Sequence, residues 1–149
     1  MSNSVRFAPP MRTVRKRYAD AMKGVTNFPQ LYSNISVWLD RWNKQNFKTQ
    51  GGKVGGWKPF KLGGRPTKGG GIDKSAKLLQ DTGHLRASFL PIATSRAGGI
   101  SSDLYYAEAH QEGMGPLPQR RMVPEPEEVI DDIMQIADKH ADKHLRKLK

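Results

Sequence analysis

The sequence contains Asp81-Thr82-Gly83, the tripeptide on which aspartic proteases carry their catalytic carboxylate. Such a site needs two buried carboxylates that share one proton, because two like charges a few ångströms apart cannot both ionise. Gln80 precedes the aspartate and His84 follows the glycine, where a protease has an apolar strand and a small residue. A turn is the plainer interpretation: Asp81 or Thr82 bonds the local backbone, Gly83 is left-handed, and the chain passes from helix to strand.

A second chemical pattern lies near the C-terminus. His140 and His144 are four residues apart on a predicted helix, a spacing that can bring two imidazoles to one metal ion. This spacing does not identify a third ligand. Asp138 and Asp142 are also four residues apart in the same helix. The pattern is also typical of the solvated flank of an amphipathic helix, which is the interpretation we favour. We therefore expect no metal, no cofactor and no catalysis.

A third pattern is the basic, glycine-rich segment at residues 48–73. Neither Lys53 nor Lys68 is followed by Ser or Thr, so the order of a phosphate-binding P-loop is absent. We expect a long mobile loop. Such a loop can lie along a phosphate backbone or dock on a partner.

Composition limits the class of protein. The 149 residues fit one domain, and the absence of cysteine excludes disulfides, thiolate zinc sites and cysteine nucleophiles. The chain has no apolar signal region and no stretch near the roughly 20 apolar residues of a membrane span, so we expect no membrane contact. The net charge is +11. Residues 1–75 hold 15 Lys and Arg against three acidic residues, whereas residues 76–149 hold 10 against 11.

This charge asymmetry favours contact between the N-terminal half and a polyanion or an acidic protein surface. We interpret residues 1–27 as a basic arm, extended or with a short irregular element, and residues 28–149 as a single α+β domain. The candidate DNA- or partner-facing residues are Arg12, Arg15, Lys16, Arg17, Lys53, Lys58, Lys61, Arg65 and Lys68.

Two amphipathic helices are predicted from apolar residues at three- and four-residue steps. The first spans Pro29 to Phe47, and its Trp38 and Trp42 are expected to be anchors in the core or at a subunit interface. The second runs from Glu125 to about Lys147, with acidic residues in its first turns and basic residues in its last.

The middle of the chain is predicted to be less regular. We expect a short helix over residues 73–79 and a strand over residues 85–94, with Leu85, Ala87 and Phe89 on one face. A turn at Gly98-Gly99 should return the chain into a second strand that leads into residues 105–111, forming a hairpin. An extended, proline-rich segment then crosses to the last helix. The fold class is therefore a small antiparallel sheet packed with helices.

Several segments, in this order, resemble the phage virion-morphogenesis family, the tail-completion and head-tail joining proteins of which the Mu G-type protein is the familiar member. They are GGWKPF after the first helix, LQDTGHLRAS, YAEAHQEG, and LPQRRM before the last helix. Arg121 and Met122 stand where the family often has Pro and Phe. The motif positions are Trp57, Pro59, Asp81, Thr82, Gly83, Leu85, Ser88, Tyr106, Ala107, His110, Gln111, Gly113, Pro118 and Arg120.

The resemblance implies a structural virion protein that completes the tail or joins tail to head. It implies an α+β subunit that assembles with itself into a ring. The expected partners are therefore further copies of the chain, other neck or tail proteins such as the connector or the tail tube, and phage DNA held by nonspecific contacts. The expected location is the tail or neck of the virion, and the host cytoplasm during assembly. A nonspecific nucleic-acid-binding protein that uses the basic arm and the glycine-rich loop is the alternative.

Overall fold

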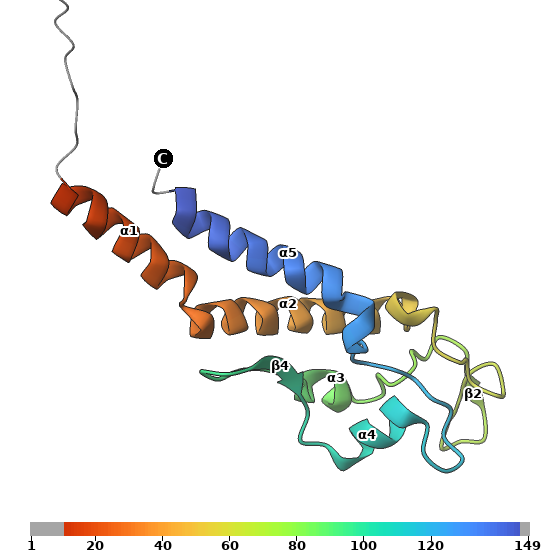
Figure 1. Cartoon of the computed structure of the whole chain (residues 1–149). Coiled ribbons are helices and arrows are strands. Elements are labelled where there is room, and N and C mark those ends of the chain that lie inside the picture. Colours follow the sequence, from red (N-terminus) through yellow and green to blue (C-terminus); the bar gives the residue numbers. More distant parts are fainter. Residues whose placement is uncertain (1–10, 147–149) are drawn as a thin grey trace, which may run out of the picture.

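The computed structural model describes residues 11–146. Their fold is α+β, as predicted: a long central helix separates a pair of helices on one side from two small antiparallel hairpins and two short helices on the other (Figure 1). The elements, in chain order, are α1 (Met11–Val25), α2 (Phe28–Lys48), the 3-10 helix η1 (Gly52–Val54), β1 (Arg65–Pro66), β2 (Ile72–Asp73), α3 (His84–Ser88), β3 (Leu90–Ala93), β4 (Gly98–Ser101), α4 (Tyr105–Glu112) and α5 (Pro126–Leu145).

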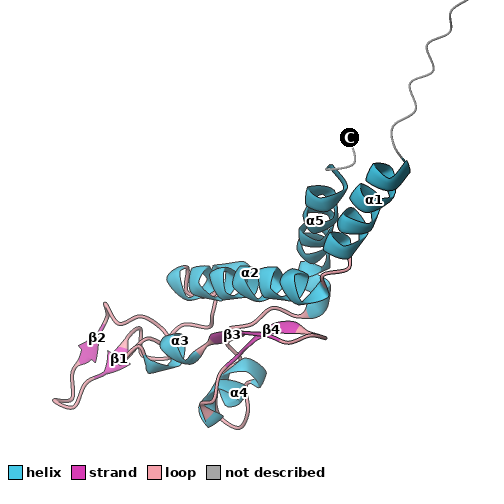
Figure 2. Cartoon of the chain, turned by 90° about the vertical axis from the view of Figure 1, so that its left-hand side faces the viewer, coloured by secondary structure: helices cyan, strands magenta, loops and turns pink. Residues whose placement is uncertain are grey.

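Helix α2 confirms the first predicted helix. The Asn27 side chain accepts a hydrogen bond from the Gln30 amide, and Pro29 lies in the first turn, where its missing N–H costs nothing. The helix buries Leu39, Trp42 and Phe47 on one face. The hairpins and short helices lie along one side of α2, and both strands of the β3–β4 hairpin contact this helix (Figure 2).

The core lies beneath the C-terminal half of α2. Phe47 is fully buried and meets the Trp57 ring edge-on at 5.1 Å and the Phe89 ring at 6.0 Å. Around these three rings pack Leu78, Leu85, Ala107 and Met122. The glycine-rich segment, α3, α4 and the approach to α5 thus each contribute a side chain to a single cluster, which fixes the course of the irregular loops between them.

Helix α1 corrects the expectation of an irregular arm. Residues 11–25 are helical, and α1 packs beside the second half of α5. Ala21 is buried, and His140 Nε2 donates to the Gly24 carbonyl oxygen at 3.1 Å. Small side chains make this close approach of two helices possible, and an alanine and a glycine are weak signals in a sequence read for large apolar stripes. Residues 1–10 of the predicted arm lie outside the described residues.

Helix α5 confirms the last predicted helix, although the predicted residue 147 lies outside the described range. Its start is a capping box: the Glu125 side chain accepts from the Glu128 amide, and Glu128 Oε2 accepts from the Glu125 amide at 3.0 Å. Arg121 pairs with Glu128 at 2.8 Å. The backbone bond and then Arg121 hold the pKa of the Glu128 carboxyl below its usual value.

The predicted hairpin is confirmed as β3 and β4, which pair antiparallel with Pro91 opposite Ile100. The predicted position of the turn was wrong: Gly98 and Gly99 are paired residues of β4, and the chain reverses over residues 94–97, where the Thr94 amide donates to the Ala97 carbonyl oxygen at 2.8 Å. The hairpin packs beneath α2, because the Ser36 hydroxyl accepts from the Gly99 amide at 3.0 Å and donates to the Ile92 carbonyl oxygen. The chain then enters helix α4 rather than extending the second strand.

Two predictions for the middle of the chain were wrong. Residues 73–79 do not form a helix: Asp73 Oδ1 accepts from the Ser75 amide in a local turn, and Leu79 has a left-handed φ of 56°. Residues 84–88 are helical, so the predicted strand begins only at Leu90. Leu85 and Phe89 are buried four residues apart, a spacing that fits one helical face as well as the alternation of a strand.

The glycine-rich segment follows a defined, mostly irregular course. It contains η1 and the two-residue hairpin β1–β2, in which Arg65 pairs with Asp73. Trp57 anchors the segment in the core, and Gly51 at φ 86° reverses the chain beside its ring. The buried Trp57 therefore fixes the middle of the segment to the core. That the segment is mobile stays a prediction.

Candidate functional site

The motif segments meet around residues 120–123, a strap that crosses beneath α2 on its way to α5. Asn43 donates to the Met122 carbonyl oxygen at 2.9 Å, and Asn46 donates to that of Arg121 at 2.9 Å. The Trp57 indole donates to the same Arg121 carbonyl at 2.8 Å. Buried polar groups that are paired in this way hold the strap in one register.

Gln111 holds the strap from the other side. Its Oε1 accepts from the amides of Met122 and Val123 at 2.8 and 3.1 Å, and its Nε2 donates to the Val123 carbonyl oxygen at 3.0 Å. One side chain on α4 thus satisfies three backbone groups that have no strand partner. This gives the Gln of the YAEAHQEG motif a structural role.

The remaining motif residues of this region shape its turns and packing. Ala107 is in the core, and the Ser88 hydroxyl lies 2.6 Å from that of Ser102 and donates to the Leu85 carbonyl oxygen at 2.8 Å. Gly113 ends α4 with φ 70°, and a side chain there would meet the backbone of Gln119 at 2.8 Å. Only glycine fits this close approach.

Arg120, the first residue of the strap, is the most unusual member of the group. It is only 8% exposed, its amide donates to the His110 carbonyl oxygen at 2.8 Å, and its Nε donates to the Lys58 carbonyl oxygen at 3.0 Å. Its guanidinium carbon lies 5.9 Å from the centre of the Phe60 ring. Burial lowers the pKa of this guanidinium, and among the described residues no carboxylate pairs with it.

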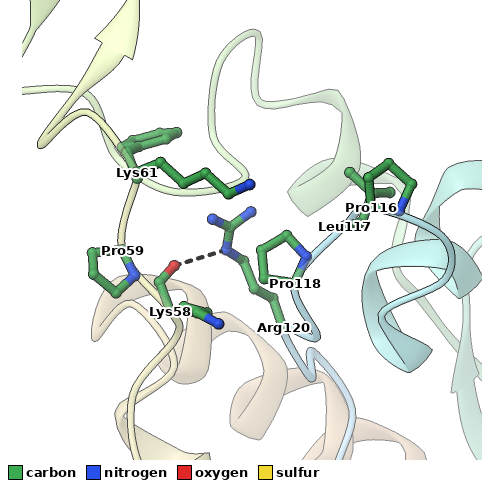
Figure 3. A pocket seen from close by; sticks show the side chains of 8 residues that line it. Lys58, Pro59, Lys61, Pro116, Leu117, Pro118 and Arg120 are labelled. Carbon is green, nitrogen blue, oxygen red and sulfur yellow. Dashed lines mark hydrogen bonds between the residues drawn. The ribbon is translucent and has the colours of Figure 1, made fainter.

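The Arg120 side chain borders an open pocket of about 430 Å³ (Figure 3). The walls combine two more cations with apolar groups and contain no acidic residue. In Figure 3 the end of the guanidinium and the Lys61 side chain converge on one side of the pocket. The lining residues are Lys58, Pro59, Phe60, Lys61, Pro116, Leu117, Pro118 and Arg120. We call this the Arg120 pocket.

Asp81 lies next to a neighbouring hollow of about 260 Å³ that shares Phe60 and Arg120 with the Arg120 pocket. Its carboxylate pairs with Arg65, which also donates to the Lys77 carbonyl oxygen at 3.0 Å. The Asp81 side chain is 75% exposed, so it does not provide the buried carboxylate that a protease dyad needs.

The turn at residues 81–83 is partly as predicted. Gly83 is left-handed with φ 79°, and the Thr82 hydroxyl accepts from the His84 amide at 3.4 Å. Asp81, in contrast, makes a long-range ion pair, and the turn leads into helix α3 instead of out of a helix into a strand. The ion pair could not be predicted because Arg65 lies 16 residues away, in the glycine-rich segment.

His110 lies beside the same hollow. Its Nδ1 is buried without a hydrogen-bond partner among the described residues. Burial, and to a lesser extent the nearby Arg120 charge, lowers the pKa of this imidazole below its ordinary value. The side chain is therefore held in the neutral form near pH 7.

The predicted basic residues fall into two groups that the fold keeps apart. Arg12, Arg15, Lys16 and Arg17 are exposed on α1. The others lie in the glycine-rich segment, beyond the opposite end of α2 (Figures 1 and 2). Of that second group, Lys58 and Lys61 line the Arg120 pocket and Arg65 lies nearby, whereas Lys53 and Lys68 are exposed elsewhere.

His140 and His144 lie where α5 packs against α1. Their rings are 5.1 Å apart, and His140 is buried and bonded to α1. Across residues 11–146, no group of three or more His, Cys, Asp or Glu side chains is placed to hold a metal ion.

Sequence reasoning missed two residues of the site, Asn43 and Asn46, and it assigned no role to Phe60 of the GGWKPF motif. The two asparagines lie on the apolar face of α2, next to Trp42 and Phe47. Polar residues inside an apolar stripe are a usable signal, since a buried amide must find a partner. The partner itself, about 75 residues further along the chain, is set by the fold.

The fold and this site define an α+β protein with a cationic, partly apolar pocket. No protein-family model, curated protein or solved structure matches the chain. Within residues 11–146, every helix is too short or too polar to cross a membrane.

Proposed function

We propose that this chain is a structural virion protein that completes a phage tail or joins tail to head, as one subunit of a homo-oligomeric ring. The proposal starts from the resemblance of its ordered motifs to the virion-morphogenesis family. The motifs, distant in sequence, build one scaffold around the strap at residues 120–123, as expected of segments that maintain a common subunit shape.

The observation that carries the assembly part is the exposure of large apolar side chains on two separate surfaces. On the helix pair, Tyr18 and Met22 of α1 are exposed one turn apart. On the opposite side of α2, Leu90 and Ile92 of β3 are exposed at 62% and 44%. A head-to-tail contact requires two different interaction surfaces on each subunit. Such contacts form a closed ring when the rotation between neighbouring subunits divides a full turn evenly.

Mass measurement tests this proposal. Sedimentation of the full chain should reveal a discrete oligomer, and incubation with purified phage tails or filled capsids should yield a bound fraction. Electron microscopy of the oligomer should show closed rings. A strict monomer that binds neither tails nor capsids would contradict the proposal.

Nonspecific nucleic-acid binding is the second candidate, and the exposed cations of α1 support it. Duplex DNA should then bind the monomer with a strong dependence on salt, because each neutralised phosphate releases counterions. Replacing Arg12, Arg15, Lys16 and Arg17 with Gln should remove this binding. Unchanged affinity in an anisotropy titration would exclude α1 as the contact.

A further inference from the structure

We propose that the Arg120 pocket receives a carboxylate, supplied by the exposed start of helix α5 in a second copy of this chain. This inference rests on the proposed function, since it names the partner surface of a self-assembling subunit. The two surfaces are distinct, so the contact is complementary rather than a patch meeting itself.

The first argument is the uncompensated charge of Arg120. A buried cation is costly unless it is paired, yet the guanidinium has no carboxylate partner among the described residues. Its Nε is used by the Lys58 carbonyl oxygen, which fixes the guanidinium plane and leaves the two terminal nitrogens without a hydrogen-bond partner in the described part of the chain. Two parallel N–H donors in a fixed plane match the two oxygens of a carboxylate.

The second argument is the shape of the pocket. Arg120 lines the pocket together with the apolar side chains of Pro59, Pro118 and Leu117, so a carboxylate on a short apolar stem can meet both kinds of group. Lys58 and Lys61 also line the pocket and are exposed, which adds two cations. A Glu or Asp side chain fits this description better than duplex DNA, whose phosphates lie on a broad convex surface and are usually met by exposed cations.

The third argument is a matching surface on the same chain. Glu127, Ile130, Asp131 and Met134 are exposed and follow steps of three and four residues, so they form one stripe along α5. We call it the α5 stripe. Ile130 and Met134 are 51% and 55% exposed, and neither Glu127 nor Asp131 has an ion-pair partner within residues 11–146. Two carboxylates and two apolar side chains complement three cations and apolar walls.

Charge reversal tests the contact in the full-length chain. The pocket variant carries Lys58→Glu and Lys61→Glu, and the stripe variant carries Glu127→Lys and Asp131→Lys. All four positions are exposed, so folding should be preserved, which thermal unfolding verifies. Each variant should weaken self-association, measured by sedimentation equilibrium, on the order of tenfold or more, because like charges then face each other. A chain with all four changes should recover most of the affinity.

Matched controls carry the same charge changes elsewhere. Lys68→Glu and Asp103→Lys are exposed and lie outside both surfaces, and they should leave association within about twofold of the unchanged chain. If the controls weaken self-association as much as the test variants do, the effect comes from net charge alone and the assignment is overturned.

The outcomes separate this inference from the proposed function. A ring that forms unaltered in both test variants overturns the pocket contact and leaves the ring intact, whereas a chain that stays monomeric at all concentrations overturns both. Binding of a 20-base-pair DNA duplex to the same variants is the last measurement. If the pocket variant keeps its self-association but loses binding to the duplex, the pocket serves phosphate and the carboxylate assignment is wrong.

Discussion

At the scale of single residues, amide side chains supply the backbone hydrogen bonds that a neighbouring strand would supply in a larger sheet. Asn43, Asn46 and Gln111 bond the backbone of the strap, which has no ladder of its own. Such bonds depend on one rotamer of one side chain, so each residue is hard to replace. A buried donor or acceptor left without a partner costs about 1–3 kcal/mol.

Gln111→Ala tests this role. The change leaves two amides and one carbonyl of the strap unpaired, so the free energy of unfolding should fall by about 2–3 kcal/mol. Urea denaturation followed by tryptophan fluorescence measures it. Gln119→Ala, at an exposed position without such bonds, is the matched control and should change stability by less than about 0.5 kcal/mol. Equal effects of the two changes would contradict the assigned role.

His110 predicts a pH dependence of stability. Its folded-state pKa is lowered, mainly by burial, so below about pH 6.5 the unfolded chain binds a proton that the folded chain does not. Stability should therefore decrease as pH falls from 7.5 to 5.5, and part of this decrease should disappear in His110→Gln. Denaturation series at both pH values provide the comparison. The idea fails if the two proteins lose the same free energy over this interval.

At the scale of elements, the β3–β4 hairpin is too small to be stable alone and depends on α2. Ser36 bonds both strands, and Gly98 lies so close to α2 that an added side chain would clash with the Tyr32 carbonyl oxygen. The helix therefore sets where the hairpin lies, and with it the exposed face that β3 presents.

Gly98→Ala should therefore be destabilising by about 1–3 kcal/mol, because neither backbone can move aside without disturbing its own hydrogen bonds. Gly99→Ala, one residue further along, meets nothing within 4 Å and serves as control. Its effect should stay near that of an ordinary exposed glycine replacement. Thermal unfolding of both variants decides the matter, and indistinguishable midpoints would argue against close packing of the hairpin on α2.

At the scale of the whole molecule, α2 separates surfaces that face in different directions. The helix pair with the α1 cations lies at one end of α2, the β1–β2 hairpin and the Arg120 pocket lie at the other, and the β3–β4 hairpin packs beneath the N-terminal half of α2 (Figures 1 and 2). The basic residues do not form one continuous face, so a single groove for DNA on one subunit has little support. Separate surfaces at separate ends suit a subunit whose neighbours lie on different sides.

The exposed hairpin predicts a specific assembly defect. Leu90→Thr with Ile92→Thr keeps strand propensity and removes apolar area at positions that are already exposed, so the subunit should fold with its stability within about 1 kcal/mol. Oligomers should dissociate at concentrations where the unchanged chain is assembled, as seen by light scattering after gel filtration. Thr94→Ser, an exposed change at the end of β3, should leave assembly unchanged. If the double variant assembles fully, the hairpin is not part of the contact between subunits.

The sequence by itself determined the two long helices, the β3–β4 hairpin and the glycine turn at Gly83, because periodicity, caps and glycine preferences are local. It did not determine helix α1, whose packing depends on small residues, nor helix α3, where Leu85 and Phe89 fit two periods equally well. Only the tertiary structure decided that Asp81 pairs with Arg65 and that Arg120 is buried beside Phe60 and Lys58 without a carboxylate. Such contacts join residues far apart in sequence, and no local preference encodes which of them meet.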